Sequence, residues 1–186
     1  TAALTLALGI GLSTAVFTVA DALLIRRLPV RDQDRLVLLW GETPDGRFAS
    51  FPFSWDDAHG FIQQSRALER AAYFAYEGAW RQTVQDGDRV SSLRRSAVSG
   101  DFFAVLGAQP IVGRALGAED DVIGAAPVAV LSYPAWQQQF GGDPNVVGKR
   151  IALHDTRVTY TIVGVMPQGL DYPRGTDFWA TVAGST

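Results

Sequence analysis

TAALTLALGIGLSTAVFTVA, residues 1–20, contains no charged side chain, and this stretch decides how the remainder of the chain is interpreted. A membrane-spanning helix needs about 20 mostly apolar residues, because the hydrocarbon core is about 30 Å thick and each helical residue rises about 1.5 Å. Neither Gly nor Pro interrupts the sequence between Ser13 and Leu28. We therefore expect residues 1–25 to form a transmembrane helix that continues past Asp21 as a stalk into a water-facing domain.

Two other interpretations of this stretch compete with the transmembrane helix. A secretory signal peptide begins with Met and a basic segment, whereas this chain begins at Thr1 without one. Ala20-Asp21-Ala22 nevertheless has the small-x-small form of a cleavage site. A buried core helix is the second alternative, although such helices are seldom free of charge over so many residues.

Small residues recur at every fourth position of the apolar stretch, so that they share one face of the helix. They are Ala3, Ala7, Gly11 and Ala15. Small side chains in this register let another helix approach closely, which is how membrane helices pack. We therefore predict a helix-packing face at these four residues. Since a single anchor rarely needs such a face, we also expect the chain to be a fragment with partner membrane helices outside it.

The composition excludes several classes of protein. The formal net charge is −3 and no concentrated basic cluster occurs, which argues against a nucleic-acid partner. The absence of cysteine excludes a disulfide scaffold and a thiolate metal site. Residues 30–186 are enough for one domain or two small lobes.

The alternation of short β-prone runs with amphipathic helices predicts an α+β fold for these residues. Strands are expected at 35–40, 71–76, 80–84, 90–98, 127–131, 151–153, 158–165 and 177–182, and helices at 54–65, 99–107 and 132–140. Asp86-Gly87 is a strong hairpin turn, and Ser132 is expected to cap the last helix. Ser99 or Asp101 should cap the short helix before Gly107. The 132–140 helix should pack on its neighbouring strands, through the side chains Trp136 and Phe140.

No catalytic, cofactor-binding or metal-binding set is evident, so we expect the chain not to be an enzyme. His59 and His154 are the only histidines, and the HExxH pattern of zinc proteases is missing. Glu119-Asp120-Asp121 lacks the alternating oxygen ligands of a calcium loop and is interpreted as a solvated acidic loop. The sequence also lacks GxSxG and GxxxxGK[ST] motifs, so any ATP hydrolysis must occur on another chain.

Phrases along nearly the whole chain then point to one family. They are LALGIGLSTAVFTVADALLIRRLP (6–29), VSGDFF (98–103), PVAVLSYPAWQQQFGGDPNVVGKRIAL (127–153) and YTIVGVMPQGLDYP (160–173). In this order they resemble the MacB-type periplasmic core domain of ABC-transporter permeases, in the MacB/FtsX-like superfamily, and most closely that of the duplicated orphan permeases. The resemblance implies an inner-membrane protein with this domain on the periplasmic or extracellular side.

The same resemblance implies how the chain is divided and what it works with. It implies a porter-like lobe with a smaller α/β lobe inserted into it: residues 30–97 would begin the porter-like lobe, 98–172 would form the insert, and 173–186 would return to the first lobe. ATP would bind to a cytoplasmic ABC ATPase, with no cofactor in this chain. A second permease copy, the membrane and a periplasmic adaptor are the other implied partners. Their joint function would be to transmit ATPase-driven motion across the membrane.

Two functions of other classes remain as alternatives. One is a membrane-anchored extracytoplasmic ligand-binding or sensor module, with its ligand between the lobes. The other is an anchored hydrolase, which the missing nucleophile and base disfavour. Three further hydrophobic spans after Thr186 would favour a permease, and a cytoplasmic signalling domain would favour a sensor.

Overall fold

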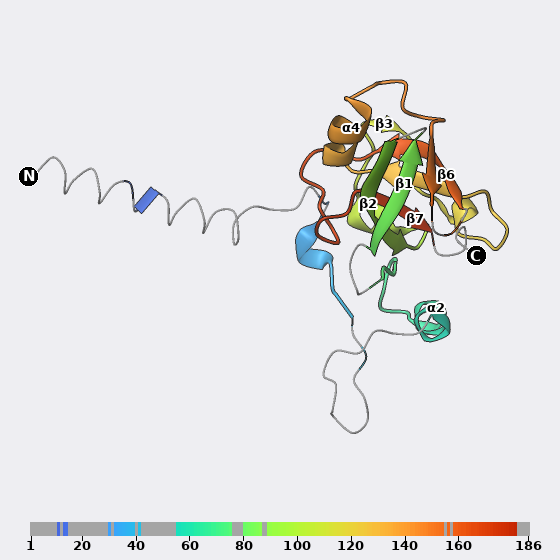
Figure 1. The fold of residues 1–186 in the computed structure, drawn as a ribbon. Coiled ribbons are helices and arrows are strands. Elements are labelled where there is room, and N and C mark those ends of the chain that lie inside the picture. Colours follow the sequence, from blue (N-terminus) through green and yellow to red (C-terminus); the bar gives the residue numbers. More distant parts are fainter. Residues whose placement is uncertain are drawn as a thin grey trace, which may run out of the picture.

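Six strands close into a small barrel, and a seventh strand of two residues pairs with the end of one of them (Figure 1). The strand order is β3-β6-β4-β7-β2-β1-β5, and β5 also pairs with β6, which closes the ring. The strands are β1 (Trp80–Asp86), β2 (Arg89–Val98), β3 (Val112–Gly113), β4 (Val128–Leu131), β5 (Arg150–Leu153), β6 (Thr159–Val165) and β7 (Phe178–Thr181). The pairs β2–β7 and β4–β6 are parallel, and the other pairs are antiparallel. Closure leaves few strand edges open to unwanted pairing.

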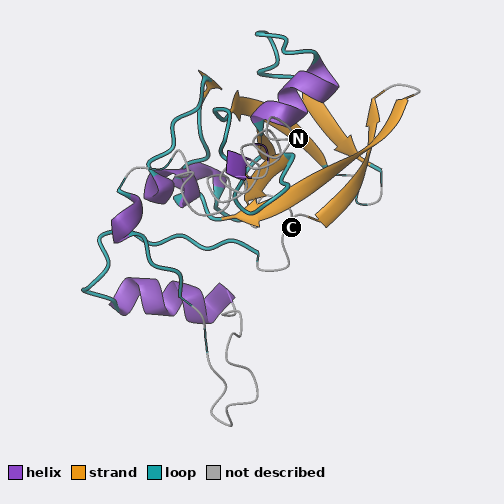
Figure 2. Cartoon of the chain, turned by 90° about the vertical axis from the view of Figure 1, so that its left-hand side faces the viewer, coloured by secondary structure: helices purple, strands orange, loops and turns teal. Residues whose placement is uncertain are grey.

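The computed structural model describes residues 11, 13–14, 30, 32–39, 41, 55–75, 80–86, 89–154, 156 and 158–181. Its helices are α2 (Trp55–Gln64), α3 (Phe102–Leu106) and α4 (Tyr133–Phe140), with 3-10 turns η2 (Gln33–Arg35) and η3 (Ala118–Asp120). Figure 2 shows α2 standing apart from the strands. Within the described ranges, no helix combines the length and apolarity needed to cross a bilayer. The predicted transmembrane helix lies outside them, apart from three helical residues, which are Gly11, Ser13 and Thr14.

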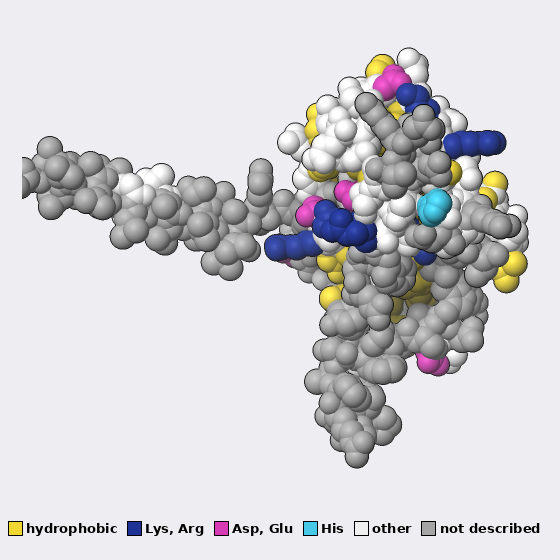
Figure 3. Space-filling view, in the orientation of Figure 1, with side chains coloured by type: hydrophobic (Ala, Val, Ile, Leu, Met, Phe, Trp, Pro, Cys, Tyr) yellow, Lys and Arg dark blue, Asp and Glu magenta, His cyan; other side chains and the backbone are white. Residues whose placement is uncertain are grey.

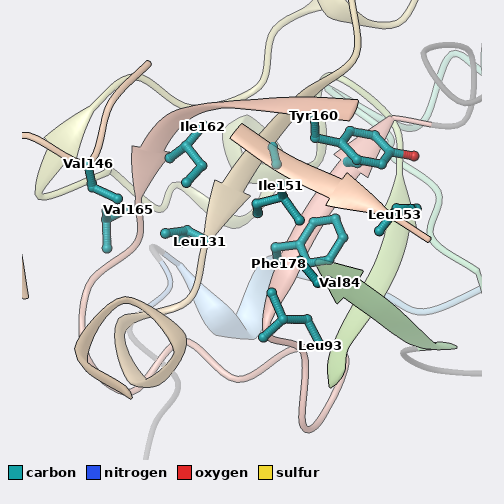
Figure 4. Packing of buried hydrophobic residues seen from close by; sticks show 12 residues of the cluster. Val84, Leu93, Leu131, Val146, Ile151, Leu153, Tyr160, Ile162, Val165 and Phe178 are labelled. Carbon is teal, nitrogen blue, oxygen red and sulfur yellow. The ribbon is translucent and has the colours of Figure 1, made fainter. Parts of the chain in front are cut away.

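The interior of the barrel is filled by one hydrophobic cluster to which all six closed strands contribute (Figure 4). Tyr160, Ile151 and Phe178 are among its largest fully buried side chains. Trp136 and Phe140 of α4 pack against this cluster, which confirms the predicted contact of that helix with its neighbouring strands.

A second hydrophobic cluster covers the outside of β2, β4 and β7. Along β4, Ala129 and Leu131 belong to the interior cluster, whereas Val128 and Val130 belong to the outer one. Successive side chains of a strand point to opposite faces, so these strands are buried on both sides. α3 supplies Phe103, whose ring meets Trp179 of β7 edge-to-face at 5.4 Å between centroids.

Most of the expected local structure is present. Strands β1 and β2 form the predicted hairpin, β5 and β6 form the second one, and β4 and β7 lie where they were expected. Ser132 caps α4, since its Oγ accepts a hydrogen bond from the Ala135 N–H at 3.4 Å. The short helix is also confirmed, but the Asp101 side chain forms no cap hydrogen bond, and Ser99 Oγ instead accepts from the Tyr73 N–H at 3.1 Å.

The strand expected at 35–40 is wrong in the part that the structure describes. Residue 35 ends the 3-10 turn η2, and residues 36–39 have no strand structure. Val37 is 68% exposed, Leu38 53% and Leu39 45%. An apolar run predicts burial, but a strand also needs a partner strand, and no described strand pairs with this segment.

The closed sheet has strands on both sides of the predicted lobe boundary between residues 97 and 98. β1 and β2 lie before that boundary, yet β1 pairs with β5 and β2 pairs with β7. Hydrophobic patterning identified the strands individually but held no information on pairing between segments so far apart. The fold is mixed α/β, and its closed sheet runs from residue 80 to residue 181.

Candidate functional site

Two consecutive aspartates at the end of η3 join distant parts of the chain. Asp120 is buried, and its carboxylate accepts two hydrogen bonds from the Arg114 guanidinium, at 2.6 and 2.8 Å. It also accepts one from the Gly117 N–H at 2.9 Å. Its backbone carbonyl accepts from Thr181 Oγ1 at 2.7 Å, at the last residue of β7. Asp120 therefore holds the loop before β4 against the barrel.

Asp121 makes the second connection, towards the segment that follows α2. Its Oδ2 accepts a hydrogen bond from the Tyr73 hydroxyl at 2.9 Å and one from the Gly100 N–H at 3.0 Å. The segment 71–75 is further tied to β2 by the backbone bonds from Ala75 N–H to the Ala97 carbonyl and from Ser99 N–H to the Tyr73 carbonyl. We call the hydrogen-bonded set around Asp120 and Asp121 the aspartate junction. It comprises Tyr73, Gly100, Arg114, Gly117, Asp120, Asp121 and Thr181.

The electrostatics of the junction favour its present protonation states. Burial by itself would raise the pKa of Asp120, but hydrogen bonds from Arg114 and Gly117, together with the Arg114 charge, lower it below the usual range. Burial raises the pKa of the Tyr73 phenol, and its hydrogen bond to Asp121 and the charge of that carboxylate raise it further. At neutral pH the Tyr73 phenol is therefore neutral, and the Asp120 carboxylate is paired with the Arg114 guanidinium.

This arrangement suits a structural connection better than chemistry. The hydrogen-bonding partners of the two aspartates come from the chain itself, and no nucleophile with an adjacent base is found among them. Within the described ranges, no three His, Cys, Asp or Glu side chains gather as metal ligands would. The interpretation of residues 119–121 as a solvated acidic loop is wrong for Asp120, because its carboxylate is buried.

The residues singled out from the sequence are only partly described. Of the predicted helix-packing face, Ala3, Ala7 and Ala15 lie outside the described residues. Gly11 is helical and exposed, and a Cβ added to it would meet no described atom within 4 Å. His154 is exposed at the end of β5, and the side chain of His59 on α2 lies outside the description. The predicted packing face therefore stays a prediction.

A second candidate surface lies on the segment before the barrel. Val37, Leu38 and Leu39 are exposed together with Phe61 of α2, which is 45% exposed. Arg35 and Glu69 are paired at 3.0 Å, which ties η2 to the chain just after α2. We call these four residues the exposed apolar set. On the side shown in Figure 3, one group of Lys and Arg side chains lies beside acidic side chains, and further basic side chains lie at separate places.

The sequence did not reveal the junction, because its members are far apart in the chain. Tyr73 and Asp121 are 48 residues apart, and Asp120 and Thr181 are 61 apart. The only local signal was the pair of aspartates followed by Val122-Ile123-Gly124, which is compatible with many loops. Arg114 lies six positions before its partner Asp120, outside the acidic run.

Comparison with known proteins identifies the family to which this domain belongs. The chain belongs to the MacB-like periplasmic core domain family, whose model matches residues 1–183. The resemblance found in the sequence is thereby confirmed. A search of curated protein sequences gives no match.

Two solved structures show the same fold at low sequence identity. One is the periplasmic region of MacB from Actinobacillus actinomycetemcomitans, with a TM-score of 0.54, 19% identity, and coverage of 69% of this chain and 55% of that one. The other is the extracellular domain of the noncanonic ABC-type transporter YknZ from Gram-positive bacteria, with a TM-score of 0.55, 15% identity, and coverage of 69% and 62%. The chain thus matches little more than half the length of these solved domains.

Proposed function

We propose that this chain is the extracytoplasmic core domain and first membrane helix of an ABC-transporter permease, and that it transmits ATPase-driven motion across the membrane. Family membership and the charge-free stretch at residues 1–20 support this proposal. ATP would bind and be hydrolysed on a cytoplasmic ABC ATPase. The domain would lie on the periplasmic or extracellular side and would itself be non-catalytic.

The observation that carries the proposal is the exposed apolar set. Three of its side chains directly follow Leu36, which packs against the outer cluster, and the fourth lies on α2, which stands apart from the strands (Figure 2). A water-facing domain that worked alone would gain about 25 cal/mol for each Å² of this surface that it buried. Their exposure fits a two-lobe domain in which further chain of the permease completes the porter-like lobe around η2 and α2.

The lobe boundary is then best placed between residues 75 and 80, in place of the one predicted at 97. Residues 30–75 would begin the porter-like lobe, and the closed sheet of residues 80–181 would be the inserted lobe. Tyr73 and its hydrogen bond to Asp121 would join the two. A connection of this kind, with backbone bonds on either side, is suited to moving the lobes as one body when the stalk moves.

The partners follow from this arrangement. A second permease copy would form a dimer in the inner membrane, and the face at Ala3, Ala7, Gly11 and Ala15 would pack against a membrane helix. A periplasmic adaptor is a further partner of the outer domain.

The decisive experiment loosens the stalk in the complete permease assembled with its ATPase. Ala20→Gly together with Ala22→Gly should reduce the coupling of ATP hydrolysis to transport, because each glycine weakens a helix by about 1 kcal/mol relative to alanine. His59→Gln with His154→Gln is the matched control and should leave coupling unchanged. Normal coupling in the glycine variant, with a loss in the histidine variant, would overturn the mechanical role and point to a metal or catalytic site.

A further inference from the structure

A rigid turn displays two aliphatic side chains beside the aspartate junction. The Ala125 N–H donates to the Val122 carbonyl at 3.0 Å, and Gly124 has a φ of 85°. A positive φ at the third residue is what a type II turn requires, and glycine adopts it without strain. The turn leaves Ile123 93% exposed and Val122 53% exposed. We call residues 122–125 the aliphatic turn; it belongs to the yellow part of the chain at the right-hand edge of Figure 1.

The aliphatic turn is fixed at its base. Asp121, the residue directly before it, is held by the Tyr73 hydroxyl and the Gly100 N–H. The preceding Asp120 is held by Arg114 and by Thr181 at the end of β7. After the turn, the chain enters β4 at Val128, where it is buried. Binding through a fixed segment loses little conformational entropy, so such a turn is a favourable anchor.

The surroundings of the turn are acidic. The Glu119 side chain is 72% exposed, and Asp101 is exposed next to Gly100, whose N–H contacts Asp121. Arg114, the cation of the junction, forms two hydrogen bonds with Asp120 and lies 3.7 Å from Glu119. An apolar tip with an acidic border matches a surface of opposite sign, and it would be repelled by an anionic bilayer.

We propose that the aliphatic turn is a docking site for a partner protein, which receives Ile123 in an apolar pocket bordered by Lys or Arg side chains. This goes beyond the transmission role, because it assigns a binding site to particular residues of the outer domain. Ile123 is the anchor and Val122 extends the apolar contact. Glu119 and Asp101 select the charge of the partner and accelerate the encounter.

Photo-crosslinking in native membranes tests the proposal in the complete permease. Ile123 is replaced by p-benzoylphenylalanine, and the control carries the same probe at Val147, which is 45% exposed elsewhere on the barrel. The expected result is a cross-link from position 123 to a different protein, absent from position 147. The cross-linked peptide, identified by mass spectrometry, should contain apolar residues flanked by Lys or Arg. Cross-links to lipid or to a second copy of the permease, or none at all, would overturn the proposal.

Binding of the identified partner to the purified permease gives the second readout. Ile123→Ala should weaken affinity about tenfold, as expected for loss of most of one buried aliphatic side chain. Glu119→Lys should slow association at low salt, and the effect should shrink as salt screens the charges. Val147→Ala should leave affinity unchanged. Because Ile123 is so exposed, its replacement should leave the circular dichroism spectrum unaltered, and an unchanged affinity for Ile123→Ala would refute the proposal.

Discussion

Asp120→Asn is the sharpest test of the aspartate junction. The side chain is buried and accepts two hydrogen bonds from Arg114 and one from the Gly117 N–H. Asparagine keeps one oxygen for Gly117, but its NH₂ group cannot accept from the guanidinium. Hydrogen bonds to charged groups contribute about 1.5–3 kcal/mol each, and the 47% exposure of the Arg114 side chain reduces this through solvent screening. We therefore expect a loss of about 2 kcal/mol in the free energy of unfolding.

Urea denaturation of the chain in detergent, followed by tryptophan fluorescence, measures this loss. A chain of this size should also melt about 4–8 °C lower for a loss of that magnitude. Glu119→Gln is the matched control, because Glu119 lies 3.7 Å from Arg114 and its side chain is 72% exposed. That control should change stability by less than about 0.5 kcal/mol.

The pH dependence separates the charge of Asp120 from its shape. Its folded-state pKa is lowered, so its stabilising contribution is complete above the ordinary aspartate pKa of about 3.9 and is lost as the pH falls through the folded-state value. The difference between wild type and Asp120→Asn should therefore shrink below about pH 4. An equal difference at pH 3 and pH 7, or an equal effect of Glu119→Gln, would refute the role assigned to the ion pair.

Three further substitutions test other parts of the structure by the same unfolding measurement. Tyr73→Phe should cost about 1–2 kcal/mol. Because the folded-state pKa of Tyr73 is raised, its stabilising contribution is complete below the unfolded phenol pKa of about 10 and is lost progressively as the pH rises above it, in the wild type but not in the variant. An identical alkaline profile of both proteins would contradict this. Gly164→Ala should cost about 3 kcal/mol or more, because the added Cβ would overlap the Arg114 carbonyl oxygen. An unchanged stability would mean that the backbone at Arg114 can move away from β6. Trp136→Ala should cost about 2–3 kcal/mol. This is less than the cost of about 3–5 kcal/mol for a fully buried ring, because Trp136 is only half-buried, and it includes the hydrogen bond that Nε1 donates to the Asp143 carbonyl at 2.9 Å. A loss below about 1 kcal/mol would show that the ring contributes little.

The elements that could be predicted from the sequence are those specified within a few residues. Three local signals were sufficient, and the structure has all three: Ser132 before a helix, the hairpin at residues 80–98 and the second hairpin at residues 151–165. The apolar run at residues 35–40 carries a signal for burial only. No strand within the described ranges pairs with residues 36–39, and Val37, Leu38 and Leu39 remain exposed, whereas Leu36 packs against the outer cluster.

The closure of the barrel and the aspartate junction could not be predicted in this way. Both depend on contacts between residues that are neighbours only in the folded chain, such as Arg95 with Phe178 and Tyr73 with Asp121. Burial of Asp120 likewise depends on Arg114 reaching it across a loop, whereas three acidic residues in a row are typical of an exposed segment. The family resemblance supplied the general fold, and the closed sheet has strands on both sides of the lobe boundary that it implied.

The pairing of β2 with β7 has a consequence for how the chain folds during synthesis. Arg94 and Asp177, which exchange hydrogen bonds beside this pair, are 83 residues apart in sequence. The β1–β2 hairpin can form early, but one side of β2 stays without its neighbouring strand until residues 178–181 have emerged. Closing so long a loop is entropically unfavourable and slows folding. The unpaired edge of β2 is therefore the part of the nascent hairpin that a chaperone would bind. Slowing translation just before residue 178 should prolong the exposure of this edge to proteases.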